Sequence, residues 1–203
     1  TPISSPFQRR KRYHKMKNIA LLASGSGSNV QNIANYFAKN PEVHISLVIT
    51  NNPKAGVIER CKNLGVPLVY LSKAGFSSEN TLLNTLKGFS IDLIVLAGFL
   101  LKIPHGLVKA YPNKIVNIHP ALLPKFGGKG MYGMHVHRAV KDAGETETGI
   151  SIHYVNEHYD QGTLIFQAKT PVNTQDTPED IAAKIQALEA EHFPKTIETL
   201  LHA

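Results

Sequence analysis

In the first part of the chain, strand-like runs of hydrophobic residues alternate with segments in which hydrophobic residues recur at helical spacing. Compact runs of apolar and β-branched residues are typical of buried strands, and five of them lie at 18–24, 44–50, 66–71, 92–98 and 114–118. Between these runs the apolar residues recur at helical spacing, in a segment containing Val30, Ile33 and Phe37, then at 55–65, at 79–89 and after Pro104. Strands that alternate with helices predict parallel pairing with helical crossovers, and therefore an α/β fold with a Rossmann-like, doubly wound, mostly parallel sheet.

The pattern changes near residue 148. Two strand-like runs, 148–155 and 162–172, follow one another closely with Gly162 at the turn, which predicts an antiparallel hairpin. A final helix is predicted from Thr177, because this capping residue is followed by a proline in the first turn and by two acids. No repeat or linker interrupts the pattern, so we expect residues 16–203 to form one domain.

Charge is unevenly distributed along the chain. Of the 22 basic residues, five precede Met16, and the first 15 positions contain no acid, so the remainder carries 17 basic and 15 acidic residues. A net charge of +2 on that remainder gives no basic stripe, and we therefore expect no nucleic-acid partner. Residues 1–15 are expected to be a disordered N-terminal extension, because basic tracts are usually solvated.

The apolar runs and the single cysteine provide information on the cellular location of the protein. The longest apolar runs are too short to cross a bilayer, so we expect no membrane partner. Cys61 has no second cysteine to pair with and is interpreted as a packed thiol. This fits a reducing compartment, and we expect a cytoplasmic location.

Polar and glycine-rich segments follow three of the predicted strands, at 25–29, 98–103 and 117–119. Because ligands of open α/β sheets bind beyond the carboxyl ends of the strands, these segments are expected to line one site. The first segment opens a helix, where free backbone N–H groups favour an anion. Val30 breaks the dinucleotide fingerprint and the Walker lysine is missing, so a phosphate monoester fits better than NAD or ATP. A tight turn with capping serines is the alternative.

An amide and an imidazole follow the fifth predicted strand. Asn117 and His119 are two residues apart, and on an extended backbone their side chains point the same way. Together they could hold an oxyanion and move a proton, although most histidines are only hydrogen-bonded polar residues. Asp160 lies in the predicted turn between the last two strands, where a carboxylate would favour the charged form of a neighbouring imidazole. A turn aspartate that bonds its own backbone explains the residue equally well.

Four histidines raise the question of a metal. His135 and His137 form a His-x-His pair, which in an extended segment can bind zinc, and His119 and His153 could join it. No cysteine or acid stands at a convincing ligand spacing, so we expect no metal. Packing and loop hydrogen bonds are the preferred interpretation of these side chains.

Seven motifs occur in the order and spacing of one enzyme family, namely ALLASGSGSN, VLAGFL, NIHPALLPKF, HVHRAV, TGISIHYV, DQGTLIFQ and IQALEAEHFP. On these motifs the chain, from about residue 17 to about residue 200, resembles the folate-dependent phosphoribosylglycinamide formyltransferases. The resemblance implies formyl transfer from the co-substrate 10-formyltetrahydrofolate to the amine of 5′-phosphoribosylglycinamide, in purine biosynthesis. It implies that Asn117 and a protonated His119 stabilise the oxyanion and that Asp160 keeps His119 cationic.

The resemblance also implies the binding residues. The glycinamide substrate would contact Gly25, Ser26, Gly27, Ser28, Asn29, Gln186 and Glu189. The folate would contact Phe99, Leu100, Leu101, Lys102, Ile103 and Asn117, with Asn156, Glu157, His158, Tyr159 and Asp160 closing over the pterin. The partners would then be small molecules, and a homodimer is left open.

Some positions depart from the family pattern. Ala121 stands where many members have a serine, Leu101 where an arginine is common, and Glu79 where a Phe-x-x-Arg motif ends. The loop 126–137 is longer than in short bacterial forms, and its Lys129 is a candidate source of positive charge. These departures concern substrate contacts and leave the three catalytic residues unchanged.

Related enzymes share the three catalytic residues. Methionyl-tRNA formyltransferases carry a further C-terminal domain and formyltetrahydrofolate hydrolases a further N-terminal one. We expect neither, because the sequence ends at residue 203 and its first strand is predicted near its start. A sugar-nucleotide N-formyltransferase and a non-catalytic phosphate-ligand binding module are the remaining alternatives.

Overall fold

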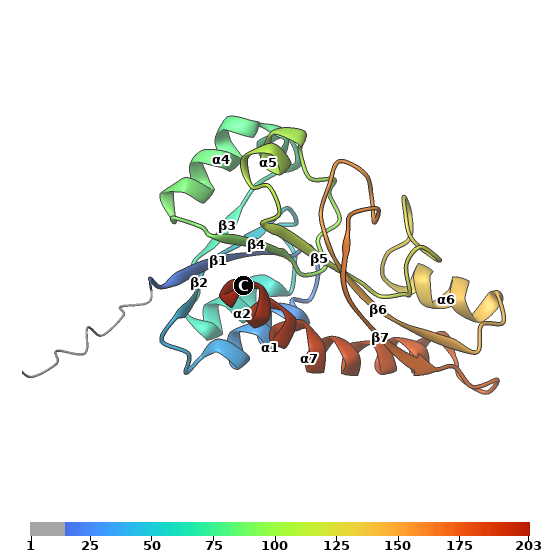
Figure 1. Cartoon of the computed structure of the whole chain (residues 1–203). Coiled ribbons are helices and arrows are strands. Elements are labelled where there is room, and N and C mark those ends of the chain that lie inside the picture. Colours follow the sequence, from blue (N-terminus) through green and yellow to red (C-terminus); the bar gives the residue numbers. More distant parts are fainter. Residues whose placement is uncertain (1–14) are drawn as a thin grey trace, which may run out of the picture.

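The computed structural model describes residues 15–203 and contains a seven-stranded sheet with helices on both faces (Figure 1). Positions 1–14, on which most of the predicted extension falls, lie outside the described residues. The strands are β1 (Lys17–Leu22), β2 (Val43–Thr50), β3 (Leu68–Tyr70), β4 (Leu93–Leu96), β5 (Ile115–His119), β6 (Glu147–Tyr154) and β7 (Leu164–Pro171). The helices are α1 (Ser28–Phe37), α2 (Val57–Leu64), α3 (Lys73–Ser77), α4 (Glu79–Gly88), α5 (His105–Ala110), α6 (Met134–Asp142) and α7 (Pro178–His202).

The strand order of the sheet is β3-β2-β1-β4-β5-β6-β7. The first five strands pair in parallel, whereas β6 is antiparallel to β5 and to β7. This confirms the predicted doubly wound, mostly parallel sheet with a C-terminal antiparallel hairpin. The carboxyl ends of β1, β4 and β5 therefore lie beside one another at one edge of the sheet.

Two helices were not predicted, α3 and α6. The first has five residues, too few to show a period. The second begins after Gly133 without a side-chain cap and contains the His-x-His pair in its first turns. Without a capping residue, the short apolar stripe of Val136 and Val140 gives only a weak sequence signal for a helix.

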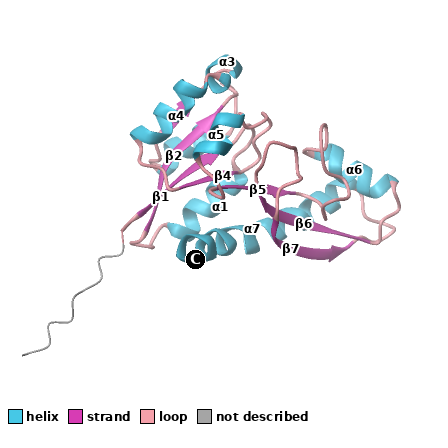
Figure 2. Ribbon diagram, turned by 45° about the horizontal axis from the view of Figure 1, so that its top comes forward, coloured by secondary structure: helices cyan, strands magenta, loops and turns pink. Residues whose placement is uncertain are grey.

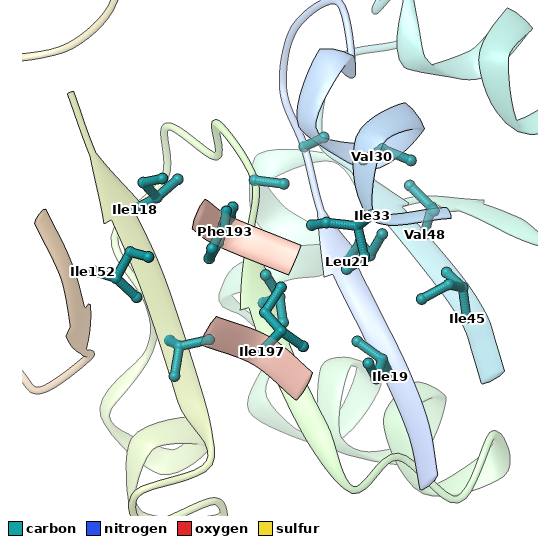
Figure 3. Packing of buried hydrophobic residues seen from close by; sticks show 14 of the residues in the cluster. Ile19, Leu21, Val30, Ile33, Ile45, Val48, Ile118, Ile152, Phe193 and Ile197 are labelled. Atoms are coloured by element: carbon teal, nitrogen blue, oxygen red, sulfur yellow. The ribbon is translucent and has the colours of Figure 1, made fainter. Parts of the chain in front are cut away.

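The core has two layers, one on each face of the sheet. One cluster joins α1, α2 and α7 to the sheet, and the other joins α3, α4 and α5 to the opposite face (Figure 2). In the first cluster Phe193 and Ile197 of α7 lie between the β5–β6 side, with Ile118 and Ile152, and the β1–β2 side of the sheet (Figure 3). Strands covered on both faces must be apolar on both, which explains the continuous hydrophobic runs in the sequence.

The last helix is held at its start by a capping box. Thr177 Oγ1 accepts a hydrogen bond from the Asp180 N–H at 3.1 Å, and Asp180 Oδ2 accepts one from the Thr177 N–H at 2.8 Å. The helix then crosses the sheet and contacts α1 and α6, so its start sets the position of Gln186 and Glu189. None of the helices in residues 15–203 has the length and apolar character needed to cross a membrane.

Replacing Thr177 with Ala should lower the melting temperature by about 2–4 °C, since an N-cap hydroxyl contributes about 1 kcal/mol in a chain of this size. Thr177→Ser keeps the hydroxyl and serves as the matched control, with a melting temperature close to that of the parent. Thermal unfolding followed by circular dichroism measures both variants. Equal losses in the two variants would contradict a capping role.

Candidate active site

A cavity of about 600 Å³ lies beyond the carboxyl ends of β1, β4 and β5. Its wall contains all the residues that the sequence predicted for catalysis or binding. These residues come from the segments 25–29, 99–103, 117–119 and 156–160 and from α7. The structure therefore brings the predicted residues together, although they are up to 164 positions apart in the chain, from Gly25 to Glu189.

The loop between β1 and α1 forms one end of the cavity. Gly27 precedes α1 with a left-handed φ of 75°, and a Cβ at this position would lie 2.6 Å from Val57 Cγ2. No side chain caps α1 and its first turn contains no acid, so the backbone N–H groups of that turn are available to an anion. Arg60 Nε donates to the Ser26 carbonyl at 2.6 Å and holds the loop against α2.

Glu189 joins the last helix to this loop. Its Oε2 accepts a hydrogen bond from Asn29 Nδ2 at 3.1 Å. Burial raises the pKa of the Glu189 carboxyl to about 7, although the Asn29 bond opposes the shift. Asn29 Oδ1 is buried and has no hydrogen-bond partner among the described residues. This end of the cavity therefore has a carboxyl group that changes charge near neutral pH.

The side chains at the centre of the cavity come from β5, β6 and the turn after β6. Asn117 and His119 of β5 both line the cavity, as their spacing predicted. In the antiparallel register Asn117 is opposite His153, and His119 is opposite Ser151. Asp160 lies in the β6–β7 turn, as predicted, and has a left-handed φ of 54°.

The Asp160 carboxylate lies between two buried imidazoles. Its Oδ2 is 3.5 Å from His119 Nδ1 and accepts a hydrogen bond from the Gly128 N–H at 2.9 Å. Its Oδ1 is 3.5 Å from His153 Nε2. On the other side of its ring, His119 Nε2 donates to the Phe126 carbonyl at 2.7 Å. Because a carbonyl only accepts, Nε2 of His119 carries a hydrogen and Nδ1 faces the carboxylate.

For Asp160 and for His119 alike, burial and neighbouring polar groups shift the pKa in opposite directions. Burial raises the pKa of the Asp160 carboxyl, but His153, His119 and the Gly128 N–H together outweigh it, so the pKa lies below its ordinary value. Burial lowers the pKa of the His119 imidazole more than Asp160 and the Phe126 carbonyl raise it. These two directions favour an anionic Asp160 and a neutral His119 imidazole. The expectation that Asp160 keeps His119 cationic stays a prediction: Asp160 raises the pKa of the imidazole, and burial of this ring, which is 3 % exposed, opposes the effect.

The segments 99–103 and 156–160 form the wall that the sequence associated with folate. Leu100 and Tyr159 are large apolar residues that are 51 % and 42 % exposed in this wall. Glu157 Oε1 lies 2.6 Å from His105 Nδ1, which ties the β6–β7 turn to the start of α5. The wall thus offers apolar surface, and the contact between Glu157 and His105 links its two segments.

The structure shows the surroundings of three positions that depart from the family pattern, namely Glu79, Ala121 and Leu101. Glu79 Oε1 accepts a hydrogen bond from the Gly106 N–H at 3.0 Å, in the first turn of α5, where negative charge is favourable. Ala121 is fully buried, so it presents no side chain to the cavity. Lys102 and Lys129 both line the cavity, and they bring positive charge to a wall where Leu101 offers none.

The His-x-His pair lies on α6 and not in the extended segment that a zinc site was considered to need. His137 is buried and lines the cavity, and its Nδ1 has no partner among the described residues. Burial lowers the pKa of His137, and the nearby His119 lowers it further. Within residues 15–203, no group of three or more His, Cys, Asp or Glu side chains is arranged to hold a metal ion.

Sequence reasoning missed the residues that support the predicted ones. Gly128 and Phe126 hold Asp160 and His119, and His153 contacts Asn117, but none of these was expected to have such a contact. The loop glycines carried no distinct signal, because the loop has no period. The pairing of His153 depends on the β5–β6 register, which residues more than thirty positions apart do not reveal.

A family model described as formyl transferase matches residues 17–197. The chain is 38 % identical over 192 residues to the chloroplastic phosphoribosylglycinamide formyltransferase of Vigna unguiculata, covering 92 % of this chain and 61 % of that protein. It is 36 % identical over 193 residues to the phosphoribosylglycinamide formyltransferase of Bacillus subtilis (strain 168), covering 92 % of this chain and 95 % of that protein. The chain thus spans less than two thirds of the plant relative and most of the bacterial one.

The fold is also similar to solved structures of phosphoribosylglycinamide formyltransferases. The structure of glycinamide ribonucleotide transformylase 1 from Geobacillus kaustophilus superposes with a TM-score of 0.83 and 38 % sequence identity, over 92 % of this chain and 99 % of that one. The phosphoribosylglycinamide formyltransferase from Bacillus halodurans superposes with a TM-score of 0.82 and 36 % identity, over 91 % and 95 % of the two chains.

Glu189→Gln should change how stability depends on pH. The pKa of about 7 in the folded chain lies above the ordinary 4.5, so the folded state keeps a proton that the unfolded state has released. Stability from this group is fully present below pH 4.5 and is lost as the pH rises to about 7. The glutamine variant stays neutral at every pH. Relative to this variant, the melting temperature of the parent should fall by several degrees as the pH rises through that range. Above about pH 7 the carboxyl is ionised in both states, so the difference between the two melting temperatures should stay constant.

Glu191→Gln is the matched control, because Glu191 is an exposed acid on the same helix. Its melting temperature should follow that of the parent at every pH. If the parent and Glu189→Gln differ by a constant amount from acidic to alkaline pH, Glu189 does not titrate near neutrality.

Proposed function

The chain belongs to the formyl transferase family, and from this premise we propose that it transfers the formyl group of 10-formyltetrahydrofolate to the amine of 5′-phosphoribosylglycinamide, in purine biosynthesis. The observation that carries the proposal is the convergence of Asn117, His119 and Asp160 with an uncapped helix start in one cavity. The three side chains suit acyl transfer to an amine, and the helix start suits a phosphate. Relatives named phosphoribosylglycinamide formyltransferase support this substrate.

The reaction begins with attack of the substrate amine on the formyl carbon. The C–N bond forms as the formyl C=O π electrons move to oxygen, which becomes an oxyanion. An N–H of the Asn117 carboxamide is assigned as the donor to this oxygen, because Asn117 lines the cavity next to His119. Removing one such donor in other enzymes lowers turnover by roughly 100-fold to 1,000-fold.

The attacking nitrogen must lose a proton, and neutral His119 is assigned as its acceptor. Because Nε2 already carries the hydrogen bonded to the Phe126 carbonyl, the proton goes to Nδ1. The imidazolium formed there lies 3.5 Å from the anionic Asp160, and its charge offsets the oxyanion. When the intermediate collapses, the bond to the folate nitrogen breaks and that nitrogen takes the proton from His119, directly or through water.

The two substrates occupy different parts of the wall. The phosphate is assigned to the N–H groups of 25–29, and the glycinamide to Gln186 and Glu189 at the same end. The folate is assigned to 99–103 and 156–160, where Leu100 and Tyr159 offer apolar surface. The anionic parts of both substrates have Lys102 and Lys129 as the cations of the cavity wall.

The parent protein should release tetrahydrofolate from 10-formyltetrahydrofolate in proportion to added phosphoribosylglycinamide. Methionyl-tRNA and an amino-sugar nucleotide should give no such release. The proposed phosphate site at 25–29 lies beside the proposed glycinamide site at Gln186 and Glu189, which suits a small phosphorylated amine. Absorbance of the folate product and mass spectrometry of the formylated amine measure both. If the sugar nucleotide were formylated as fast or faster, the assignment of phosphoribosylglycinamide as the substrate would be contradicted.

Asp160→Asn should lower turnover by roughly 100-fold or more, because the imidazolium of His119 loses the anion that stabilises it. The substrate phosphate should still bind with near-parental affinity, since the 25–29 loop is a separate element. Steady-state kinetics and calorimetric binding of phosphoribosylglycinamide measure the two effects.

Asp142→Asn controls for the loss of one negative charge, because Asp142 is exposed at the end of α6. It should retain parental turnover. If Asp160→Asn also kept near-parental turnover, Asp160 would have only a structural role in the β6–β7 turn. The proposed proton transfer through His119 would then be wrong.

A further inference from the structure

Helix α2 supports the loop 25–29 from behind. The cavity wall contains residues 25–29, whereas none of its described residues comes from α2. Val57, the first residue of α2, donates its backbone N–H to the Gly25 carbonyl at 3.1 Å. Arg60, in the next turn, donates from Nε to the Ser26 carbonyl at 2.6 Å. Two successive carbonyls of the loop are therefore bonded to the helix, on the side away from the cavity.

These two bonds set the direction of the backbone N–H groups in the loop. In a trans peptide the C=O and the N–H point in opposite directions, so the N–H groups of Ser26 and Gly27 point away from α2. Neither of them, nor the N–H of Ser28 or Asn29, donates to a carbonyl in residues 15–203. The free donors thus lie on the cavity side of the loop, beside an uncapped helix start that favours an anion.

Of the two bonds, only that of Arg60 comes from a side chain. Its Nε is the one side-chain atom of Arg60 with a hydrogen bond among the described residues. The backbone contacts between loop and helix do not depend on it, because the Val57 N–H bond remains and a Cβ at Gly56 would lie only 3.2 Å from Ser26 Cα. A substitution of Arg60 would therefore release the Ser26–Gly27 peptide and leave the loop in contact with the helix.

We propose that Arg60 is a positioning residue for the substrate phosphate, whose hydrogen bond to the Ser26 carbonyl keeps the Gly27 N–H directed at that phosphate. Without this bond the Ser26–Gly27 peptide can rotate, since glycine has no Cβ to restrict its φ. The Ser26 carbonyl oxygen would then face the phosphate and repel it. The inference rests on the proposed function, because it concerns the phosphate of the proposed substrate.

Two substitutions of Arg60 separate its hydrogen bond from its charge. Gln has an N–H donor at the position of Nε and no charge, whereas Met has the same reach with neither donor nor charge. Arg60→Met should raise the KM for phosphoribosylglycinamide roughly tenfold, because one donor to the phosphate is lost. The kcat and the KM for 10-formyltetrahydrofolate should not change. Arg60→Gln should keep the first KM within about threefold of the parent, since a partly exposed charge contributes little.

Lys62→Met is the control for the loss of one positive charge, because Lys62 is exposed on the same helix. It should leave all three constants unchanged. Equal losses in Arg60→Gln and Arg60→Met would show that the charge acts and not the hydrogen bond, and would contradict the inference. A parental KM for phosphoribosylglycinamide in Arg60→Met, or a loss in kcat alone, would contradict it as well.

Inorganic phosphate tests the loop without the reaction. Its dissociation constant, from phosphorus-31 NMR titration, should rise in Arg60→Met and return towards the parental value in Arg60→Gln. In the parent, proton–nitrogen spectra should show the Gly27 amide proton moving downfield as phosphate binds, which covers the case in which a variant does not fold. A Gly27 amide that does not respond, or a parent that binds no phosphate, would overturn the inference. A parent that binds phosphate in this way but does not formylate phosphoribosylglycinamide would instead remove the proposed function.

Discussion

The antiparallel pairing of β5 with β6 is the constraint on which the site depends. It sets Asn117 opposite His153, and it returns the chain so that the turn carrying Asp160 reaches the carboxyl end of β5. A shift of this register by one residue would turn the facing side chains to the other side of the sheet. The buried residues Ile118 and Ile152, which pack with Phe193 of α7 on the opposite face, hold the register (Figure 3).

Burial has two effects on the chemistry of this site. It lowers the pKa of His119, although an anion lies 3.5 Å from its Nδ1. It also makes the attraction between Asp160 and a newly formed imidazolium stronger than in water, because the local dielectric is low. In the proposed reaction, His119 therefore begins as a base and ends the proton transfer as an imidazolium paired with Asp160. Burial also raises the pKa of Glu189 to about 7, at the end of the cavity formed by the loop before α1.

The sequence predicted the fold well because its elements are locally marked. The capping box at Thr177, the helix stop at Gly65 and the strand runs each depend on neighbouring residues. The rule that ligands bind beyond the strand ends then placed Asn117 and His119 at one cavity. Local patterns could not give the pKa shift of His119, which depends on burial by distant segments, nor the contact between His153 and Asn117, which depends on the strand register. The helix α6 was missed because no side-chain cap marks its start and its apolar stripe, Val136 and Val140, is short.

The protonation of His119 tests this account most directly, because the proposed proton path begins from a neutral imidazole beside an anionic Asp160. Nitrogen-15 chemical shifts of the two ring nitrogens, followed against pH in the parent protein, report the tautomer and the pKa together. The account predicts a hydrogen on Nε2, a bare Nδ1 at pH 7, and a pKa below the ordinary value of 6.5. An imidazolium at pH 7, with a pKa above 6.5, would contradict it.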